Sequence, residues 1–308
     1  EKANASRVFT GPDFWNFDMS WSTLIGGADF GKYHSSMGHA VYASEGTDYS
    51  TDIHNAFQTP EDALAFEPME ALGTPDHAEL VERFDTHYRA NCESTPDAVN
   101  MTGIYITCMS GMIDLFGWDI LLTAAGIDQK AFGELANRYA LWIQQYYNAL
   151  ADSDVPVVMV HDDIVWTGGA FIHPDWYRKY SFPNYKNYFR PLLDSGKKIL
   201  YTSDGDYTEF IDDVAKCGVH GFVLEPLTDM SYVAEKYGKT HAFVGNADTR
   251  VLLSGTREDI RGEVERCMNI GKKYPGFIMA VGNHIPANTP VDSAIYYNDV
   301  YEELSRRK

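Results

Sequence analysis

From residue 99 onward, the hydrophobic positions alternate between short apolar runs and longer segments of helical period. The run at 99–108 predicts a buried strand, and the segments around 112–125 and 132–150 predict two amphipathic helices after it. Five more strand and helix pairs follow in strict alternation. We predict the strands at 155–160, 198–201, 221–224, 241–244 and 277–281, and the helices at 174–194, 207–217, 230–237, 257–273 and from Asp292 onward.

Repeated β-α units of this kind indicate a parallel sheet. The run at 155–160 is apolar on both faces, as parallel strands covered by helices require. No glycine-rich phosphate loop follows any strand, which disfavours an open doubly wound sheet. Since 308 residues is an ordinary length for one barrel, we predict the α/β class and a single-domain (β/α)8 TIM barrel over 1–308.

The first 98 residues show poor hydrophobic periodicity, and in this they diverge from the regular units that follow. They predict one helix, which begins near Thr74-Pro75-Asp76 and continues through Leu80 and Phe84. The regular β/α units therefore occupy 99–308.

Composition excludes several classes of protein. Hydrophobic residues make up 44% of the chain and charged residues 22%, the balance of a globular protein. A net charge of -19 argues against a nucleic-acid partner, which needs a basic surface. No apolar run approaches the ~20 residues that cross a bilayer, and no signal-like segment opens the chain, so we expect no membrane and a cytoplasmic location. The four cysteines lie singly, which is typical of reduced thiols: Cys92, Cys108, Cys217 and Cys267.

Polar side chains follow the predicted strands where each apolar run ends. Because the carboxyl ends of barrel strands converge on one rim, we expect these side chains to form one site. Strand residues alternate, so His161 and Asp163 should face one way and Asp162 the other. The segments are 161–163 (His-Asp-Asp), 203–206 (Ser-Asp-Gly-Asp), 225–226 (Glu-Pro), 245–248 (Gly-Asn-Ala-Asp) and 282–284 (Gly-Asn-His).

Structural roles compete with functional ones at these positions. Asp163, Asp204 and Asp206 also suit caps of helices or turns, and His284 also suits a core histidine. A histidine at a strand end among carboxylates favours metal binding or proton transfer instead. We interpret five other histidines as structural or surface residues, namely His34, His39, His173, His220 and His241.

Residues from about 155 to 305 carry a set of motifs in a fixed order, and in this they resemble the uroporphyrinogen decarboxylase superfamily. The motifs are Asp162-Asp163, His173-Pro174-Asp175-Trp176-Tyr177, Tyr201-Thr202-Ser203-Asp204-Gly205-Asp206, Gly245-Asn246-Ala247-Asp248, Gly255-Thr256-Arg257-Glu258, and Gly282-Asn283-His284-Ile285-Pro286 through Pro290.

The resemblance implies one of two chemistries. The decarboxylases hold a tetrapyrrole with many carboxylates by an early arginine-rich segment, whereas this chain has the acidic and aromatic stretch 13–18 near its start. The chain is more similar to the corrinoid-dependent methyltransferases of the O-demethylase type. Tyr201, Ser203 and Asn283 stand where the thiol-activating members of that branch have zinc ligands, so that zinc site is absent.

The ether-cleaving members imply a harder ligand set. Their Glu-x14-Glu-x20-His spacing is matched by Asp248, Glu263 and His284, with Asp in place of the first Glu. Glu263 also fits a solvated helix face.

Our hypothesis is a methyltransferase that moves a methyl group from a small methylated substrate, such as a methoxylated aromatic, to a corrinoid protein. A corrinoid on that partner is the implied cofactor, with zinc on carboxylate and histidine ligands as a second. The alternatives are uroporphyrinogen decarboxylation and a barrel that binds a corrinoid or small ligand without turnover. The candidate residues are Asp163, Asp204, Asp206 and His284 for catalysis, His161, Tyr201, Glu225, Asn246 and Trp166 for substrate, and Asp248, His284 and Glu263 for a metal.

Overall fold

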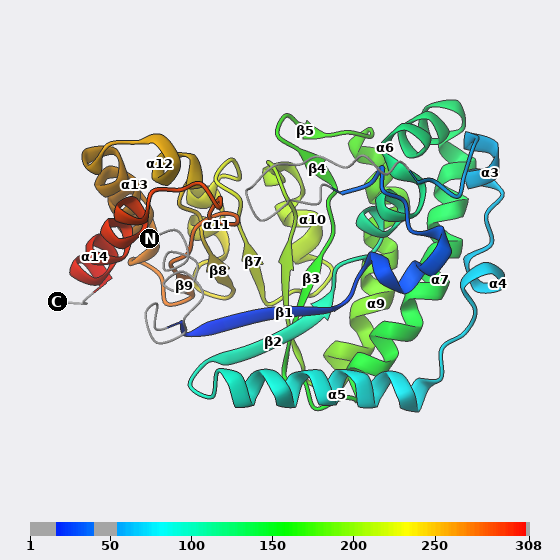
Figure 1. The fold of residues 1–308 in the computed structure, drawn as a ribbon, viewed down its shortest axis with the longest axis horizontal. Helices are drawn as coiled ribbons and strands as arrows, with labels where there is room; N and C mark the ends of the chain where they lie inside the picture. Colours follow the sequence, from blue (N-terminus) through cyan, green and yellow to red (C-terminus); the bar gives the residue numbers. More distant parts are fainter. Residues whose placement is uncertain (1–16, 40–53, 306–308) are drawn as a thin grey trace.

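A computed structural model describes residues 17–39 and 54–305 of the chain. Its centre is a curled sheet of seven parallel strands in the order β1-β2-β3-β6-β7-β8-β9 (Figure 1). Two further strands of two residues each, β4 and β5, form an antiparallel hairpin that is separate from this sheet. The strands are β1 (Met19–Ile25), β2 (Val99–Ile104), β3 (Val157–His161), β4 (Val165–Trp166), β5 (Gly169–Ala170), β6 (Lys198–Thr202), β7 (Gly221–Val223), β8 (Ala242–Val244) and β9 (Phe277–Ile278).

Helices connect the parallel strands, as the alternating sequence pattern predicts. Helix α5 packs on β1 and β2, α9 packs on β6, and α11 packs on β8 (Figure 1). The helical segments are η1 (Gly27–Tyr33), α3 (Pro60–Leu64), α4 (Pro68–Leu72), α5 (His77–Ser94), α6 (Met109–Ile127), α7 (Gln129–Asp152), α8 (Pro174–Trp176), η2 (Tyr177–Ser181), α9 (Phe182–Asp194), η3 (Thr208–Phe210), α10 (Ile211–Ala215), α11 (Met230–Tyr237), α12 (Thr249–Ser254), α13 (Arg257–Gly271) and α14 (Val291–Ser305).

The predicted α/β class and parallel sheet are confirmed, but the eight-stranded barrel is confirmed only in part. Within 17–39 and 54–305 the sheet has seven strands, and no strand pairing joins β9 to β1. A closed barrel of this type has eight strands. Here five strands run from β3 to β9 and only β1 and β2 precede them, so the described sheet is one strand short. The structure therefore shows a curled, open sheet of the barrel type.

The two faces of the sheet bury different cores. The large core lies between the outer face and the helices, and its largest fully buried side chains include Trp142 and Tyr139. The inner face holds a smaller cluster of Met101, Met159 and Leu200. Because side chains alternate along each strand, the inner row that contains Met159 continues to His161 and Asp163 at the carboxyl end.

Helix α6 corrects an expectation from the sequence. Met109–Ile127 is long and apolar enough to cross a membrane by length and composition, although no such run was expected. In this structure 61% of its most apolar window is buried, and Met112, Ile113 and Phe116 lie in the main core. The helix begins three residues earlier than predicted, because β2 ends at Ile104 rather than continuing to Cys108.

Gly103 allows β2 and β3 to pair closely. A Cβ at this position would lie 1.8 Å from the carbonyl oxygen of Met159 on β3. We expect Gly103→Ala to lower the free energy of unfolding by about 1–3 kcal/mol, because the strands must shift apart. Gly126→Ala is the matched control, since a Cβ there meets nothing within 4 Å and alanine favours the helix. Urea unfolding measures both variants, and equal stabilities would contradict the prediction.

Candidate functional site at the carboxyl ends of the strands

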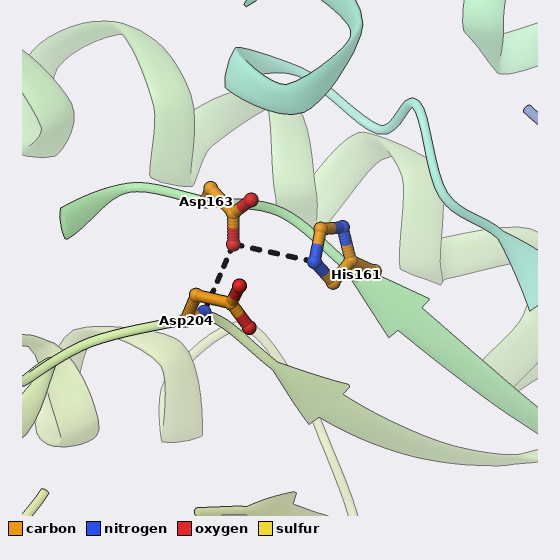
Figure 2. Close-up of side chains that lie close together, drawn as sticks. All are labelled: His161, Asp163 and Asp204. Carbon is orange, nitrogen blue, oxygen red and sulfur yellow. Dashed lines mark hydrogen bonds and ion pairs between the residues drawn. The ribbon is translucent and has the colours of Figure 1, made fainter. Parts of the chain in front are cut away.

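Three side chains meet at the carboxyl ends of β3 and β6, and we call them the mouth cluster: His161, Asp163 and Asp204 (Figure 2). His161 Nε2 lies 3.2 Å from Asp163 Oδ1. The same carboxylate oxygen accepts a hydrogen bond of 2.9 Å from the backbone N–H of Asp204. His161 and Asp163 are buried, whereas Asp204 is exposed to solvent. The cluster therefore combines a buried pair, His161 with Asp163, and a solvent-facing carboxyl group, that of Asp204.

The alternation of side chains separates the two neighbouring aspartates, as the sequence predicts. Asp162 points away from Asp163, and its Oδ1 accepts hydrogen bonds from the backbone N–H groups of Cys108 and Ser110. The hydroxyl of Tyr185 donates to its other oxygen. Burial raises the pKa of Asp162 to about 6 despite these hydrogen bonds. Asp162 thus fastens the start of α6 to β3.

His39 joins the cluster from outside the predicted strands. Its Nδ1 lies 2.6 Å from Asp114 Oδ1, and its Nε2 lies 2.8 Å from Asp163 Oδ2. With carboxylates on both ring nitrogens, the imidazole must carry two protons to donate to each. His39 therefore acts as a cation between two carboxylates.

The segment that carries His39 is held against α6. Ser35 donates its backbone N–H to Asp114 O at 2.7 Å, and Trp118 donates its own to Met37 O at 3.0 Å. A Cβ on Gly38 would lie 2.8 Å from Ile113 O, so only glycine allows this close approach. Backbone contacts thus deliver His39 to the mouth.

Burial and charge act in opposite directions on these groups. Burial by itself lowers the pKa of His39, but the hydrogen bonds and charges of Asp114 and Asp163 raise it to about 10. Burial likewise lowers the pKa of His161, yet the charge of Asp163 raises it overall. Burial raises the pKa of Asp163, but the charge and hydrogen bonds of the two histidines hold it well below its usual range. At neutral pH the cluster is therefore built on ionised pairs.

Asp204 and Glu225 are electrostatically different from Asp163. Desolvation of its carboxyl group by the surrounding mouth, and then the charge of Asp163, raise the pKa of Asp204. Burial and then the charge of Asp204 raise the pKa of Glu225 to about 7. Carboxyl groups with raised pKa values can hold a proton near neutral pH and donate it. The mouth therefore places two carboxyl groups with raised pKa values beside the ionised carboxylate of Asp163.

The donor set of the mouth cluster fits a metal ion. One ligand atom from each of His161, Asp163 and Asp204 lies within 4.8 Å of the others, and no second such group occurs in the described ranges. One imidazole and two carboxylates are suitable ligands for zinc. His161 Nδ1 faces Tyr105 O at 3.2 Å, which would leave Nε2 to the metal.

The ligand atoms of Asp248, Glu263 and His284 do not gather into a possible metal group in the described ranges, although Asp248 and His284 line one cavity. Asp248 caps α12 and forms an ion pair with Arg250, with 2.6 Å between Oδ2 and Nη2. Glu263 accepts from the backbone N–H of Asp248 at 2.8 Å and from Arg266 Nη2 at 2.7 Å. These partners already occupy the carboxylates that the sequence spacing suggested. His284 lies exposed, with Nδ1 3.1 Å from Asn283 Oδ1.

The remaining predicted site residues divide by position. Asp206 Oδ1 accepts from the backbone N–H of Thr208 at 3.0 Å, so it caps a turn. Tyr201 is fully buried on the helix side of β6 and donates to Asp162 O at 3.0 Å, away from the mouth. Asn246 is also fully buried and donates to Glu225 O and Thr228 O. Both side chains therefore lie away from the solvent-exposed surface of the mouth, and their predicted contact with a substrate stays a prediction. Trp166 is 57% exposed on the β4–β5 hairpin.

A cavity of about 760 Å³ opens beside the mouth cluster, at the ends of β7, β8 and β9. The tip of the β4–β5 hairpin contributes Thr167 to its wall. Its lining residues are Thr167, Glu225, Pro226, Leu227, Asp248, Thr249, Arg250, Asn283, His284, Ile285, Pro286 and Ala287.

Two residues of the site were missed from the sequence. We predicted that His39 is structural or at the surface, and Asp114 was not singled out. One signal was present, since Asp114 is a lone carboxylate in the apolar first turns of α6. For His39 there was none, because it lies in an aperiodic segment whose docking only the tertiary structure reveals.

Comparison with known proteins supports a family assignment. Curated relatives named uroporphyrinogen decarboxylase include those of Carboxydothermus hydrogenoformans, 28% identical over 176 residues, and Thermus thermophilus, 26% identical over 161 residues. These alignments cover 57% and 52% of this chain, and 49% and 45% of the relatives. The chain thus spans about half the length of the curated relatives it matches.

Solved structures support the fold. A methyltransferase from Methanosarcina mazei aligns with a TM-score of 0.66 at 15% identity, over 98% of this chain and 85% of that one. A B12-independent methionine synthase from Shewanella sp. W3-18-1 aligns with a TM-score of 0.53 at 10% identity, over 98% and 87%. The family model for uroporphyrinogen decarboxylase (URO-D) matches residues 33–303, which include His39, Asp114 and the mouth cluster. The chain therefore belongs to the URO-D family.

Proposed function

We propose that this protein is a methyltransferase that removes a methyl group from a small methylated substrate and passes it to a corrinoid carried by a partner protein. A methoxylated aromatic is the substrate class we favour. The methyltransferase fold of the Methanosarcina mazei protein is compatible with this reaction, and the charges at the mouth support it.

The observation that carries the proposal is the pairing of the cations at the mouth. In the described part of the chain, His39 and His161 are bonded to Asp163, and Arg250 is bonded to Asp248. Asp204 and Glu225 add two further carboxyl groups to the mouth and no cation. A substrate with many carboxylates would be repelled here, whereas a neutral methyl ether would not.

The chemistry of ether cleavage suits the mouth cluster. As the carbon–oxygen bond of the methyl ether breaks, the oxygen takes the bonding electron pair and needs a proton. Asp204, which faces solvent and has a raised pKa, is positioned to donate it. Asp163 keeps the loop of Asp204 in place by accepting its backbone N–H, and His161 holds Asp163. The methyl group leaves to the corrinoid, which supplies the nucleophile.

Zinc would fit the same three side chains. When bound, it would act as a Lewis acid on the ether oxygen in place of the proton. Elemental analysis of the purified protein measures whether zinc is present, and His161→Ala should then release it.

The second candidate is decarboxylation of uroporphyrinogen, because the curated relatives carry that name. It would require cationic groups that hold the substrate carboxylates. In 17–39 and 54–305, the cations at the mouth are instead paired with the protein's own carboxylates. Incubation with uroporphyrinogen and analysis for coproporphyrinogen tests this candidate directly.

The deciding experiment combines the protein with 2-methoxyphenol and with free cob(I)alamin as the methyl acceptor. We expect catechol and methylcobalamin to form in equal amounts. Asp204→Asn should lower turnover by about 10²–10⁴-fold, because the proton donor is lost. Asp175→Asn, an equally conservative change on an exposed side chain, should not change it. Coproporphyrinogen formation without demethylation of any methoxylated aromatic would overturn the proposal.

The third candidate is a barrel that binds its ligand without turnover. The Asp204→Asn variant distinguishes this candidate from a methyltransferase. If Asp204→Asn changes ligand affinity and no product forms with the unmodified protein, the mouth is a binding site alone.

A further inference from the structure

The cavity beside the mouth cluster has the size of a small-molecule site. Its volume of about 760 Å³ lies within the range of roughly 300–1,000 Å³ that is typical of ligand pockets. One wall is apolar and is formed by Pro226, Leu227, Ile285, Pro286 and Ala287. Leu227 is 38% exposed, so this wall offers apolar surface to a ligand.

The strand register places Asp204 and Glu225 side by side. Thr202 of β6 pairs with Val223 of β7. Asp204 and Glu225 follow these paired residues by two positions each, beyond the ends of the two strands, so alternation places both on the inner face. The charge of Asp204 accordingly acts on Glu225. Glu225 thus connects the wall of the cavity to the mouth cluster.

Glu225 also lines the cavity, and its pKa is raised to about 7 by burial and by the charge of Asp204. The charge of Arg250 acts on it without forming an ion pair, so a bound cation would favour its ionised form. Arg250 binds both carboxylate oxygens of Asp248, with Nε to Oδ1 and Oδ2 at 3.0 Å and Nη2 to Oδ2 at 2.6 Å. Glu225 receives only a hydrogen bond from the amide of Asn283, which is neutral. Among the residues that the structure describes, no lysine, arginine or histidine forms an ion pair with Glu225. A ligand cation would supply the missing partner.

We infer that this cavity selects substrates that carry a positive charge, and that Glu225 is the residue that determines this specificity. The inference rests on the proposed methyl transfer and narrows its substrate class to a methylated compound with an apolar body and an ammonium group. The ammonium lies at Glu225, the apolar body lies on Leu227 and Ile285, and the methyl ether reaches Asp204.

Three methoxybenzenes of nearly equal size test the inference: 4-methoxybenzylamine, 4-methoxybenzyl alcohol and 4-methoxybenzoate. They carry charges of +1, 0 and -1 at neutral pH. Isothermal titration of the full chain should give the tightest binding for the amine, about tenfold tighter than the alcohol, with the benzoate weakest. In Glu225→Gln the amine should lose this advantage over the alcohol.

Net charge alone attracts cations, so a control for it is needed. Glu235→Gln makes the same change on an exposed position of α11, outside the cavity. It should keep the preference for the amine. A preference that survives in Glu225→Gln, or equal binding of amine and alcohol, or no binding of any of the three, overturns the inference.

Binding and methyl transfer are measured separately, so the two proposals can fail separately. Methyl transfer from all three ethers without a charge preference would overturn the cation inference and leave the methyltransferase. A charge preference that depends on Glu225, with no transfer to cob(I)alamin, would leave the cation site and overturn the methyltransferase.

Discussion

Asp163→Asn is expected to lower the free energy of unfolding by about 3–5 kcal/mol and turnover by about 10²–10⁴-fold. Asp163 is buried and holds His39, His161 and the backbone N–H of Asp204 at once. An amide in its place removes the negative charge and leaves two imidazolium groups without their shared partner. Chemical denaturation and the 2-methoxyphenol assay measure the two effects.

The control for this variant is Asp194→Asn. Asp194 is 66% exposed and lies 3.9 Å from Arg190, so its replacement should change stability by less than about 0.5 kcal/mol. If Asp163→Asn behaves like this control in either measurement, the ionised cluster is not what holds the mouth together.

His39→Gln is expected to remove a pH-dependent part of the protein's stability. The pKa of His39 is raised to about 10 in the folded protein, above the value of about 6.5 for an unfolded chain. A raised histidine pKa means that the ionised form stabilises the fold. This contribution is fully present below pH 6.5 and is lost as the pH rises towards 10.

We therefore expect the free energy of unfolding to fall between pH 6.5 and 10 in the natural chain, and to fall less in His39→Gln. Below pH 6.5 the variant should be less stable by about 3–5 kcal/mol, because Asp114 and Asp163 then face each other without the cation. His77→Gln is the control, since His77 and Asp152 form an exposed pair. Parallel stability curves for the natural chain and His39→Gln would contradict the prediction.

The site combines parts that originate differently. His161, Asp163 and Asp204 follow strands β3 and β6, where polar residues in a barrel gather by topology. His39 and Asp114 come from a docked segment and from the start of α6. In the proposed reaction the first group would provide the carboxyl group that donates the proton, and the second group holds the ionised carboxylate of Asp163 in position.

The sequence alone determined the parallel α/β architecture from residue 99 onward, because apolar runs and helical periods report local burial and follow the chain in order. It also predicted that His161 and Asp163 share a face, since alternation along a strand is a local property. A helix from near Thr74-Pro75-Asp76 through Phe84 was predicted from similarly local signals, and the structure has it at His77–Ser94 with Asp76 as its cap.

Only the tertiary structure decided which polar residues meet. Asp248 and Glu263 have a suggestive spacing, but Arg250 and Arg266 bind them, and sequence spacing does not reveal such partners. Strand β1 and the approach of His39 to Asp163 depend on contacts between segments far apart in the chain. Long-range packing therefore assembled the charged centre, whereas local periodicity was sufficient to predict the sheet that carries it.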